Sequence, residues 1–101
     1  MMKTANDDFA LTTKAARRMR TGGIPDEAID MLAMFGREIH SEGAVRFEFD
    51  RKGRRQIEAF YAPSRPPAKI MKTYMVVDGA AVVTIGYRNT RFRIGERRHA
   101  R

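Results

Sequence analysis

In the first third of the chain, the apolar positions recur with the spacing of α-helices. Thr12 or Thr13 can cap a first helix that runs to about Arg20, because a threonine side chain accepts a hydrogen bond at a helix N-terminus. Pro25 opens a second helix at a position where its missing N–H is not needed, and Gly36 ends it. The residues predicted to face the interior are Ala15, Ala16, Met19, Ala28, Ile29, Leu32 and Phe35.

After this second helix the apolar period changes to two, which is typical of strands with one wet face. The stretch around Ile39 is the first strand, and Val45–Phe49 is the second, with a turn at Ser41-Glu42-Gly43. Lys72–Val77 and Ala80–Tyr87 then flank an Asp-Gly pair, which predicts a β-hairpin. The second of these strands is apolar on nearly every position, so we expect it to be central and covered on both faces.

The segments between these strands predict a break and a loop. Arg51-Lys52-Gly53 is expected to end the preceding strand, with a short helix over 54–61 and a proline-rich loop after it. Phe92 and Ile94 predict an edge strand. The fold class is therefore α+β, with two N-terminal helices packed on an antiparallel sheet of about four strands in one domain over 1–101. Residues 1–8 are expected to be frayed, and residues 95–101 to form a flexible basic tail.

Charge is distributed unevenly along the chain. The net charge is +8, but residues 1–50 carry seven Lys or Arg and nine Asp or Glu, a balance of −2. Residues 51–101 carry thirteen Lys or Arg and three Asp or Glu, a balance of +10. Such an asymmetry indicates a polyanionic partner, and we expect RNA. The alternative is charge that serves only solubility.

Several classes of protein are disfavoured by composition. The chain contains no Cys, so no disulfide is possible. No apolar run approaches the ~20 residues that a membrane-spanning helix needs. The first eight residues lack the apolar stretch of a signal peptide, so we expect a cytoplasmic protein without a membrane contact. No phosphate-binding loop and no set of metal ligands is readable, so we expect neither a cofactor nor a metal.

Short motifs resemble an uncharacterised bacterial family, domain of unknown function 4258, over about Lys14 to Ile94. They are Ala15-x-x-Arg18-Met19, Gly23-Ile24, Gly36-Arg37, Gly43-Ala44-Val45 and Val82-Val83-Thr84-Ile85-Gly86-Tyr87-Arg88-Asn89-x-x-Phe92-Arg93. The resemblance implies the barnase, EndoU, colicin and RelE-like fold, which is rich in RNase toxins, and a neutralising partner of antitoxin type. Members of the family often carry His at the position of Lys14 and Arg at that of Gly22, so this chain lacks two candidates for catalysis.

The candidate catalytic residues are those that a metal-independent RNase would need. His40 is a candidate general base or acid, because histidine is the residue type whose side chain ordinarily exchanges protons near neutral pH. Tyr87 is a candidate acid, and Arg88 is a candidate contact to the phosphate. Each has a plainer interpretation: an exposed histidine, a packing tyrosine and a structural arginine. His99 lies in the predicted tail, where precise positioning is not expected.

The candidate RNA-binding residues are basic. Apart from Lys14 on the first helix, they fall in two places, after the second strand and after the last strand. They are Lys14, Arg51, Lys52, Arg54, Arg55, Arg88, Arg91 and Arg93. The run at 51–55 is otherwise a solvated turn, and Lys14 a solvated helix residue. Tyr61, Tyr74 and Phe92 can stack on bases, although core packing is the favoured interpretation of each.

Three functions remain open at this point. The first is an RNA-directed protein of RelE-like toxin type, an endoribonuclease. The second is a nucleic-acid-binding protein without catalysis. The third is an interaction module whose basic half meets an acidic protein.

Overall fold

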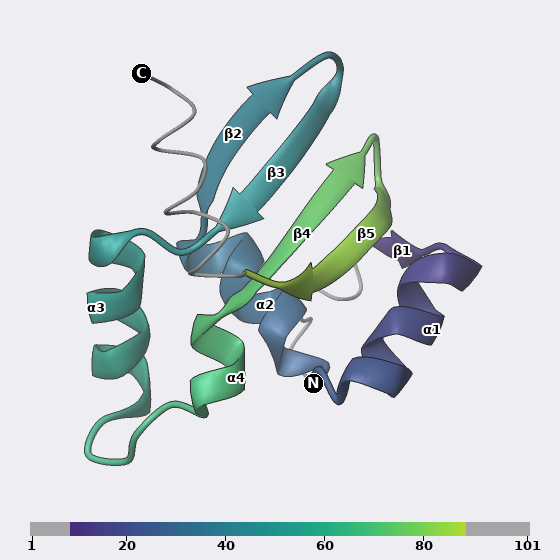
Figure 1. Cartoon of the computed structure of the whole chain (residues 1–101). Helices are drawn as coiled ribbons and strands as arrows, with labels where there is room; N and C mark the ends of the chain where they lie inside the picture. Colours follow the sequence, from purple (N-terminus) through teal and green to yellow (C-terminus); the bar gives the residue numbers. More distant parts are fainter. Residues whose placement is uncertain (1–8, 89–101) are drawn as a thin grey trace, which may run out of the picture.

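The computed structural model describes residues 9–88, which form four helices and a five-stranded sheet (Figure 1). The α+β class expected from the sequence is confirmed, but the sheet has one strand more than expected. The helices are α1 (Thr13–Gly22), α2 (Glu27–Phe35), α3 (Arg51–Tyr61) and α4 (Ala68–Met71). The strands are β1 (Ala10–Leu11), β2 (Arg37–Ser41), β3 (Ala44–Glu48), β4 (Thr73–Asp78) and β5 (Ala81–Tyr87). The segments 1–8 and 95–101 and the strand expected at Phe92 and Ile94 lie outside the described residues.

The sheet is mixed rather than purely antiparallel. Its strand order is β1-β5-β4-β3-β2, and β1 runs parallel to β5, whereas the other pairs are antiparallel. The Ala10 N–H donates to the Ala80 carbonyl at 2.8 Å, and the Thr12 N–H donates to the Val82 carbonyl at 3.1 Å. A strand of two residues is too short to show a period, so the sequence pattern did not reveal β1.

β5 has a strand on each side, as expected of a central strand, but only one of its faces is fully buried. A register shift against β4 leaves Val83 without a cross-strand partner, because Val82 and Thr84 pair with consecutive residues of β4. This β-bulge puts Val82 and Ile85 on the same buried face although they are three positions apart. The apolar run in β5 therefore reflects the bulge rather than coverage of both faces.

The two N-terminal helices form where the apolar spacing placed them. Thr12 caps α1 by accepting a hydrogen bond from the Ala15 N–H at 3.1 Å, and Gly23 ends the helix with a φ of 67°. α2 begins at Glu27, two residues after the expected start at Pro25. The residues before it form a tighter turn, in which the Ala28 N–H donates to the Pro25 carbonyl three positions back.

α3 begins earlier than the sequence predicted. A break was expected at 51–53 and a helix only from Arg54, but the helix starts at Arg51. Asp50 caps it, since its carboxylate accepts a hydrogen bond from the Gly53 N–H at 2.8 Å. The glycine that suggested a break is thus part of the first turn of α3.

The proline-rich segment after α3 is partly helical. Residues 62–67 connect the helices without regular structure, as expected, but α4 then forms just before β4. The buried Thr73 hydroxyl at the start of β4 donates to the Lys69 carbonyl at 2.8 Å, which ties the strand to α4.

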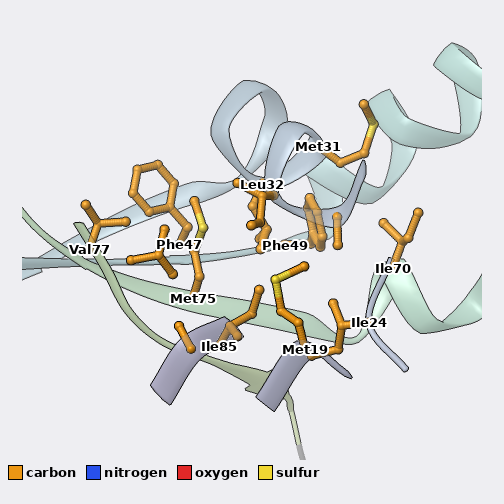
Figure 2. Packing of buried hydrophobic residues seen from close by; sticks show 14 of the residues in the cluster. Met19, Ile24, Met31, Leu32, Phe47, Phe49, Ile70, Met75, Val77 and Ile85 are labelled. Carbon is orange, nitrogen blue, oxygen red and sulfur yellow. The ribbon is translucent and has the colours of Figure 1, made fainter. Parts of the chain in front are cut away.

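The two faces of the sheet differ in chemistry. On the core face, a row across three strands is buried against residues from α1 and α2, including Met19 and Leu32 (Figure 2). This row consists of Phe47, Met75 and Ile85. On the opposite face, here called the outer face, the cross-strand rows are Glu48-Tyr74-Gly86 and Arg46-Val76-Thr84.

Candidate nucleic-acid interface

α3 carries a dense group of cations on its first two turns. Arg51, Lys52, Arg54 and Arg55 are all exposed, and none of them forms an ion pair with another residue of the described segment. Arg51 lies three and four positions from Arg54 and Arg55, which makes them neighbours on the helix surface. The sequence prediction that these four residues belong together is consistent with this arrangement, although they lie on a helix rather than on a turn.

A close approach between α2 and α3 sets where these cations lie. Gly53 is buried, and a Cβ atom there would stand 2.6 Å from the Phe35 carbonyl oxygen at the end of α2. Only glycine therefore lets the first turn of α3 pass so near to α2. Met34, Phe35, Arg37 and Lys52 belong to the lining of a surface cavity of about 240 Å³ beside this contact.

The far end of α3 is held by Tyr61. Its hydroxyl donates a hydrogen bond to the Glu27 carboxylate at the start of α2. Burial, this hydrogen bond and the negative charge of Glu27 raise the pKa of Tyr61 to about 12. Tyr61 therefore fixes the helix that presents the cations, and its neighbour Phe60 remains more exposed, with its ring 5.9 Å from that of Phe35.

α1 forms a second cationic surface. Its exposed residues include Lys14, Arg17, Arg18 and Arg20, and the helix contains no acidic residue. Figure 1 shows α1 and α3 on opposite flanks of the molecule, so Lys14 does not join the α3 cations. Acidic residues elsewhere in 1–50 bring the charge balance of that half to −2, so the sum did not indicate this surface. The charge of the first predicted helix taken alone would have indicated it.

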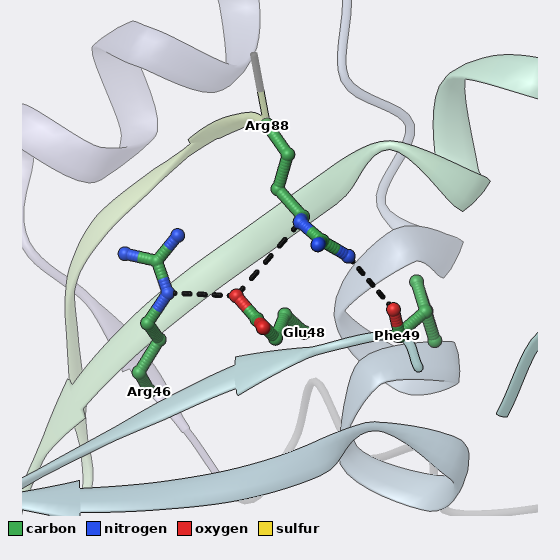
Figure 3. A network of polar contacts seen from close by, with 4 residues as sticks. All are labelled: Arg46, Glu48, Phe49 and Arg88. Carbon is green, nitrogen blue, oxygen red and sulfur yellow. Dashed lines mark hydrogen bonds and ion pairs between the residues drawn. The ribbon is translucent and has the colours of Figure 1, made fainter. Parts of the chain in front are cut away.

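Arg88 is built into the framework of the sheet. Its backbone N–H donates to the Lys72 carbonyl at 2.6 Å, and its Nη1 donates to the Phe49 carbonyl at 2.7 Å (Figure 3). Its Nε lies 3.8 Å from Glu48 Oε1, and the side chain is only 10% exposed. Arg88 thus joins the end of β5 to the end of β3, while Arg91 and Arg93 lie outside the described residues.

Arg46 shares the same carboxylate on the outer face. Its Nε donates to Glu48 Oε1 at 3.0 Å, and its guanidinium carbon lies 4.2 Å from the centroid of the Tyr74 ring. Tyr74, a candidate for base stacking, is therefore half-buried beneath an arginine. Arg46 was not among the candidate residues predicted from the sequence, where its one signal was a position on the wet face of the second predicted strand.

Tyr87 packs against the end of α1. Its hydroxyl donates to the Gly22 carbonyl at 2.8 Å, and a Cβ at Gly22 would meet the Tyr87 ring at 3.8 Å. The packing interpretation of Tyr87 accounts for both contacts.

His40 lies at a different place in the sheet. Its side chain is 68% exposed, and Nε2 is 3.2 Å from the Glu38 carboxylate. His40 pairs with Val45, which pairs with Val77, whereas Tyr87 pairs with Thr73. These rows are four residues apart along β4, or about 13 Å, and His40 lies on the edge strand β2. The structure therefore does not bring His40, Tyr87 and Arg88 together.

Within residues 9–88, no group of three or more His, Asp or Glu side chains is arranged to hold a metal ion. Among the same residues, no helix combines the length and the apolar character needed to cross a membrane. No protein-family model, curated protein or solved structure matches the chain.

Proposed function

We propose that this protein binds RNA through the exposed cations of α3 and does not cleave it. The observation that carries the proposal is the group of four cations on the first two turns of α3, unpaired within the described part of the chain. Four such side chains on two adjacent helical turns can contact several phosphates, and contacts to the phosphate backbone supply most of the affinity in sequence-independent binding.

The position of these cations on the helix strengthens the proposal. The N-terminal end of a helix carries a partial positive charge, so basic residues there oppose the helix dipole. Like charges three and four positions apart also repel each other. Asp50 offsets part of this at the cap, and Glu58 lies near the opposite end of the helix. A bound polyanion would offset the remaining repulsion among the α3 cations. Binding therefore gives a reason for a placement of charge that by itself destabilises the helix.

Binding is a better match to the geometry than cleavage. An endoribonuclease needs a base, an acid and a cation around one phosphate. His40 lies about four residues along the sheet from the row of Tyr87, and Arg88 is engaged with Glu48 and the Phe49 carbonyl. The RNA cleavage implied by the family resemblance stays a prediction, which the integrity of the RNA tests.

The salt dependence of RNA binding tests the proposal. A labelled single-stranded RNA is titrated with the protein at several KCl concentrations, and fluorescence anisotropy gives the affinity. We expect affinity to fall steeply with salt. The double variant Arg51→Gln/Arg55→Gln should reduce the slope of log K against log salt by about 1.4, since each lost phosphate contact on a single strand contributes ~0.7.

A matched double variant controls for overall charge. Arg65→Gln/Lys72→Gln removes the same charge from exposed positions outside α3 and should change the slope less. Salt-independent binding, or no binding at low salt, would contradict the proposal. Equal affinity for heparin would contradict the assignment to RNA.

The integrity of the RNA in the same samples separates binding from cleavage. We expect the RNA to stay intact on a denaturing gel. Cleavage by the wild type that is lost in His40→Ala or Arg88→Ala would establish the endoribonuclease instead.

A second candidate function is the interaction module for an acidic protein, which one observation favours. Phe60 and Met34 are large apolar side chains that are 58% and 53% exposed, and Met34 lines the same surface cavity as Lys52. Aromatic residues and Met are enriched at protein interfaces relative to the rest of the protein surface. A protein partner that buries Phe60 should bind the Phe60→Ser variant more weakly, whereas RNA held by the cations should bind both equally.

A further inference from the structure

Arg46 on the outer face is held in place at one side of its guanidinium. Its Nε donates to Glu48 Oε1 at 3.0 Å, and the guanidinium lies over the Tyr74 ring at 4.2 Å from the centroid. A charged hydrogen bond and an aromatic face together favour one orientation of the arginine side chain before any ligand arrives.

The other side of the same guanidinium is open to a ligand. Figure 3 shows the two terminal nitrogens of Arg46 pointing away from Glu48. Neither nitrogen has a hydrogen-bond or ion-pair partner within residues 9–88, and the side chain is 42% exposed. Arg46 therefore presents a fixed planar fork of N–H donors, the arrangement that matches two oxygens of a phosphate.

The two residues that position Arg46 are themselves supported by the framework. Glu48 also lies 3.8 Å from the nearly buried Arg88, which is anchored on the Phe49 carbonyl. The Tyr74 ring lies against Gly86 of β5, where a Cβ atom would stand 3.3 Å from the ring. A side chain at that position would crowd the ring, so the glycine permits the ring to support Arg46.

We propose that Arg46 is a phosphodiester-binding residue on the outer face of the sheet, with Glu48 and Tyr74 as its positioning residues. The proposal rests on the proposed function for the identity of the ligand as RNA, but it concerns a site separate from the α3 cations. Phosphate fits this site better than a neutral group, because the open edge of the Arg46 guanidinium carries a permanent positive charge.

The first experiment compares two variants that keep the positive charge. Arg46→Lys replaces the planar fork by a point charge, and we expect RNA affinity to fall about fivefold to tenfold with nearly the same salt slope. Arg65→Lys makes the same substitution at an exposed arginine in the loop before α4 and should leave affinity unchanged. Wild-type affinity in Arg46→Lys, with α3 variants still weakened, would overturn this inference and leave the proposed function standing.

The second experiment tests the positioning role of Tyr74. Tyr74→Leu removes the aromatic face and should weaken RNA binding about twofold to fivefold, the value of an exposed cation–π contact. Tyr74→Phe keeps the aromatic ring and should bind RNA with the affinity of the wild type. If Tyr74→Phe weakens binding as much as Tyr74→Leu, the ring does not act through Arg46 and the inference fails.

A third experiment needs no variant and does not depend on α3. The ¹⁵N-labelled wild type is titrated with the dinucleotide UpU and, separately, with uridine, while the Arg46 Nε–Hε signal is followed by NMR. We expect a shift with UpU and none with uridine, because only UpU carries a phosphodiester. The absence of a shift with UpU would overturn the assignment of Arg46. Failure of the wild type to bind RNA at all would overturn the proposed function.

Discussion

The Tyr87 hydroxyl donates a hydrogen bond to the Gly22 carbonyl oxygen at 2.8 Å and joins the end of β5 to the C-terminus of α1. The two residues are 65 positions apart in the chain. The carbonyl is one of the last in its helix and has no partner further along it, so the tyrosine satisfies an acceptor that the helix leaves open. This contact gives Tyr87 a structural role that can be tested separately from catalysis.

Replacement of Tyr87 by phenylalanine removes only this hydrogen bond. Tyr87→Phe should lower the free energy of unfolding by about 1 kcal/mol, measured by urea denaturation, and should leave RNA affinity unchanged. If Tyr87 were instead a catalytic acid, the variant would lose RNA cleavage without a loss of stability.

The ionisation of Tyr61 predicts a dependence of stability on alkaline pH. Its pKa is raised from 10.0 to about 12, by burial first and then by the hydrogen bond and charge of Glu27, so the folded state holds the phenolic proton more tightly than the unfolded chain. The associated stabilisation is fully present below pH 10.0 and is lost as the pH rises towards about 12.

Tyr61→Phe removes this contribution and serves as the comparison. The wild type should be more stable than Tyr61→Phe near neutral pH, and the difference in unfolding temperature should shrink as the pH rises from about 9 to about 12. Other groups also titrate in this range, but they are common to both proteins. A difference that stays constant with pH would contradict the assignment.

Gly53 predicts an inverted response to a common helix-stabilising substitution. Alanine usually stabilises a helix interior by about 1 kcal/mol relative to glycine. At Gly53, however, the new Cβ would stand 2.6 Å from the Phe35 carbonyl, so Gly53→Ala should destabilise the fold by about 1–3 kcal/mol. Gly22→Ala in α1 is the matched control, because its Cβ meets nothing nearer than 3.7 Å, and it should not destabilise. Equal effects at both positions would disprove the close contact of α2 and α3.

The cations of α3 predict opposite changes in stability and in binding. Arg51→Gln/Arg55→Gln relieves repulsion between neighbours on the helix and opposition to its dipole, and should raise the free energy of unfolding by about 0.5 kcal/mol. The same variant should bind RNA more weakly. Thermal unfolding at low salt measures the first change and anisotropy the second. A variant that is less stable than the wild type would show that these arginines stabilise the fold.

Local sequence signals predicted much of the fold. The threonine cap and Gly23 bound α1, the apolar spacing defined α2, and the Asp-Gly pair joined β4 and β5, because each of these signals acts within a few residues. β1 was missed because two residues show no period. The early start of α3 was missed because glycine was interpreted as a break, although Asp50 caps it and the contact with Phe35 requires it.

The candidate site divides in the same way. The order of residues alone indicated that the chain is basic and that four of its cations lie within 51–55. Their exposure on one helix, the distance of His40 from Tyr87 and the engagement of Arg88 inside the framework depend on the tertiary structure. The same holds for Arg46, whose role depends on Glu48 two positions along its strand and on Tyr74 from another strand. Charge is a property of composition, but which charges meet, and which remain exposed, depends on strand register and on helix packing between distant parts of the chain.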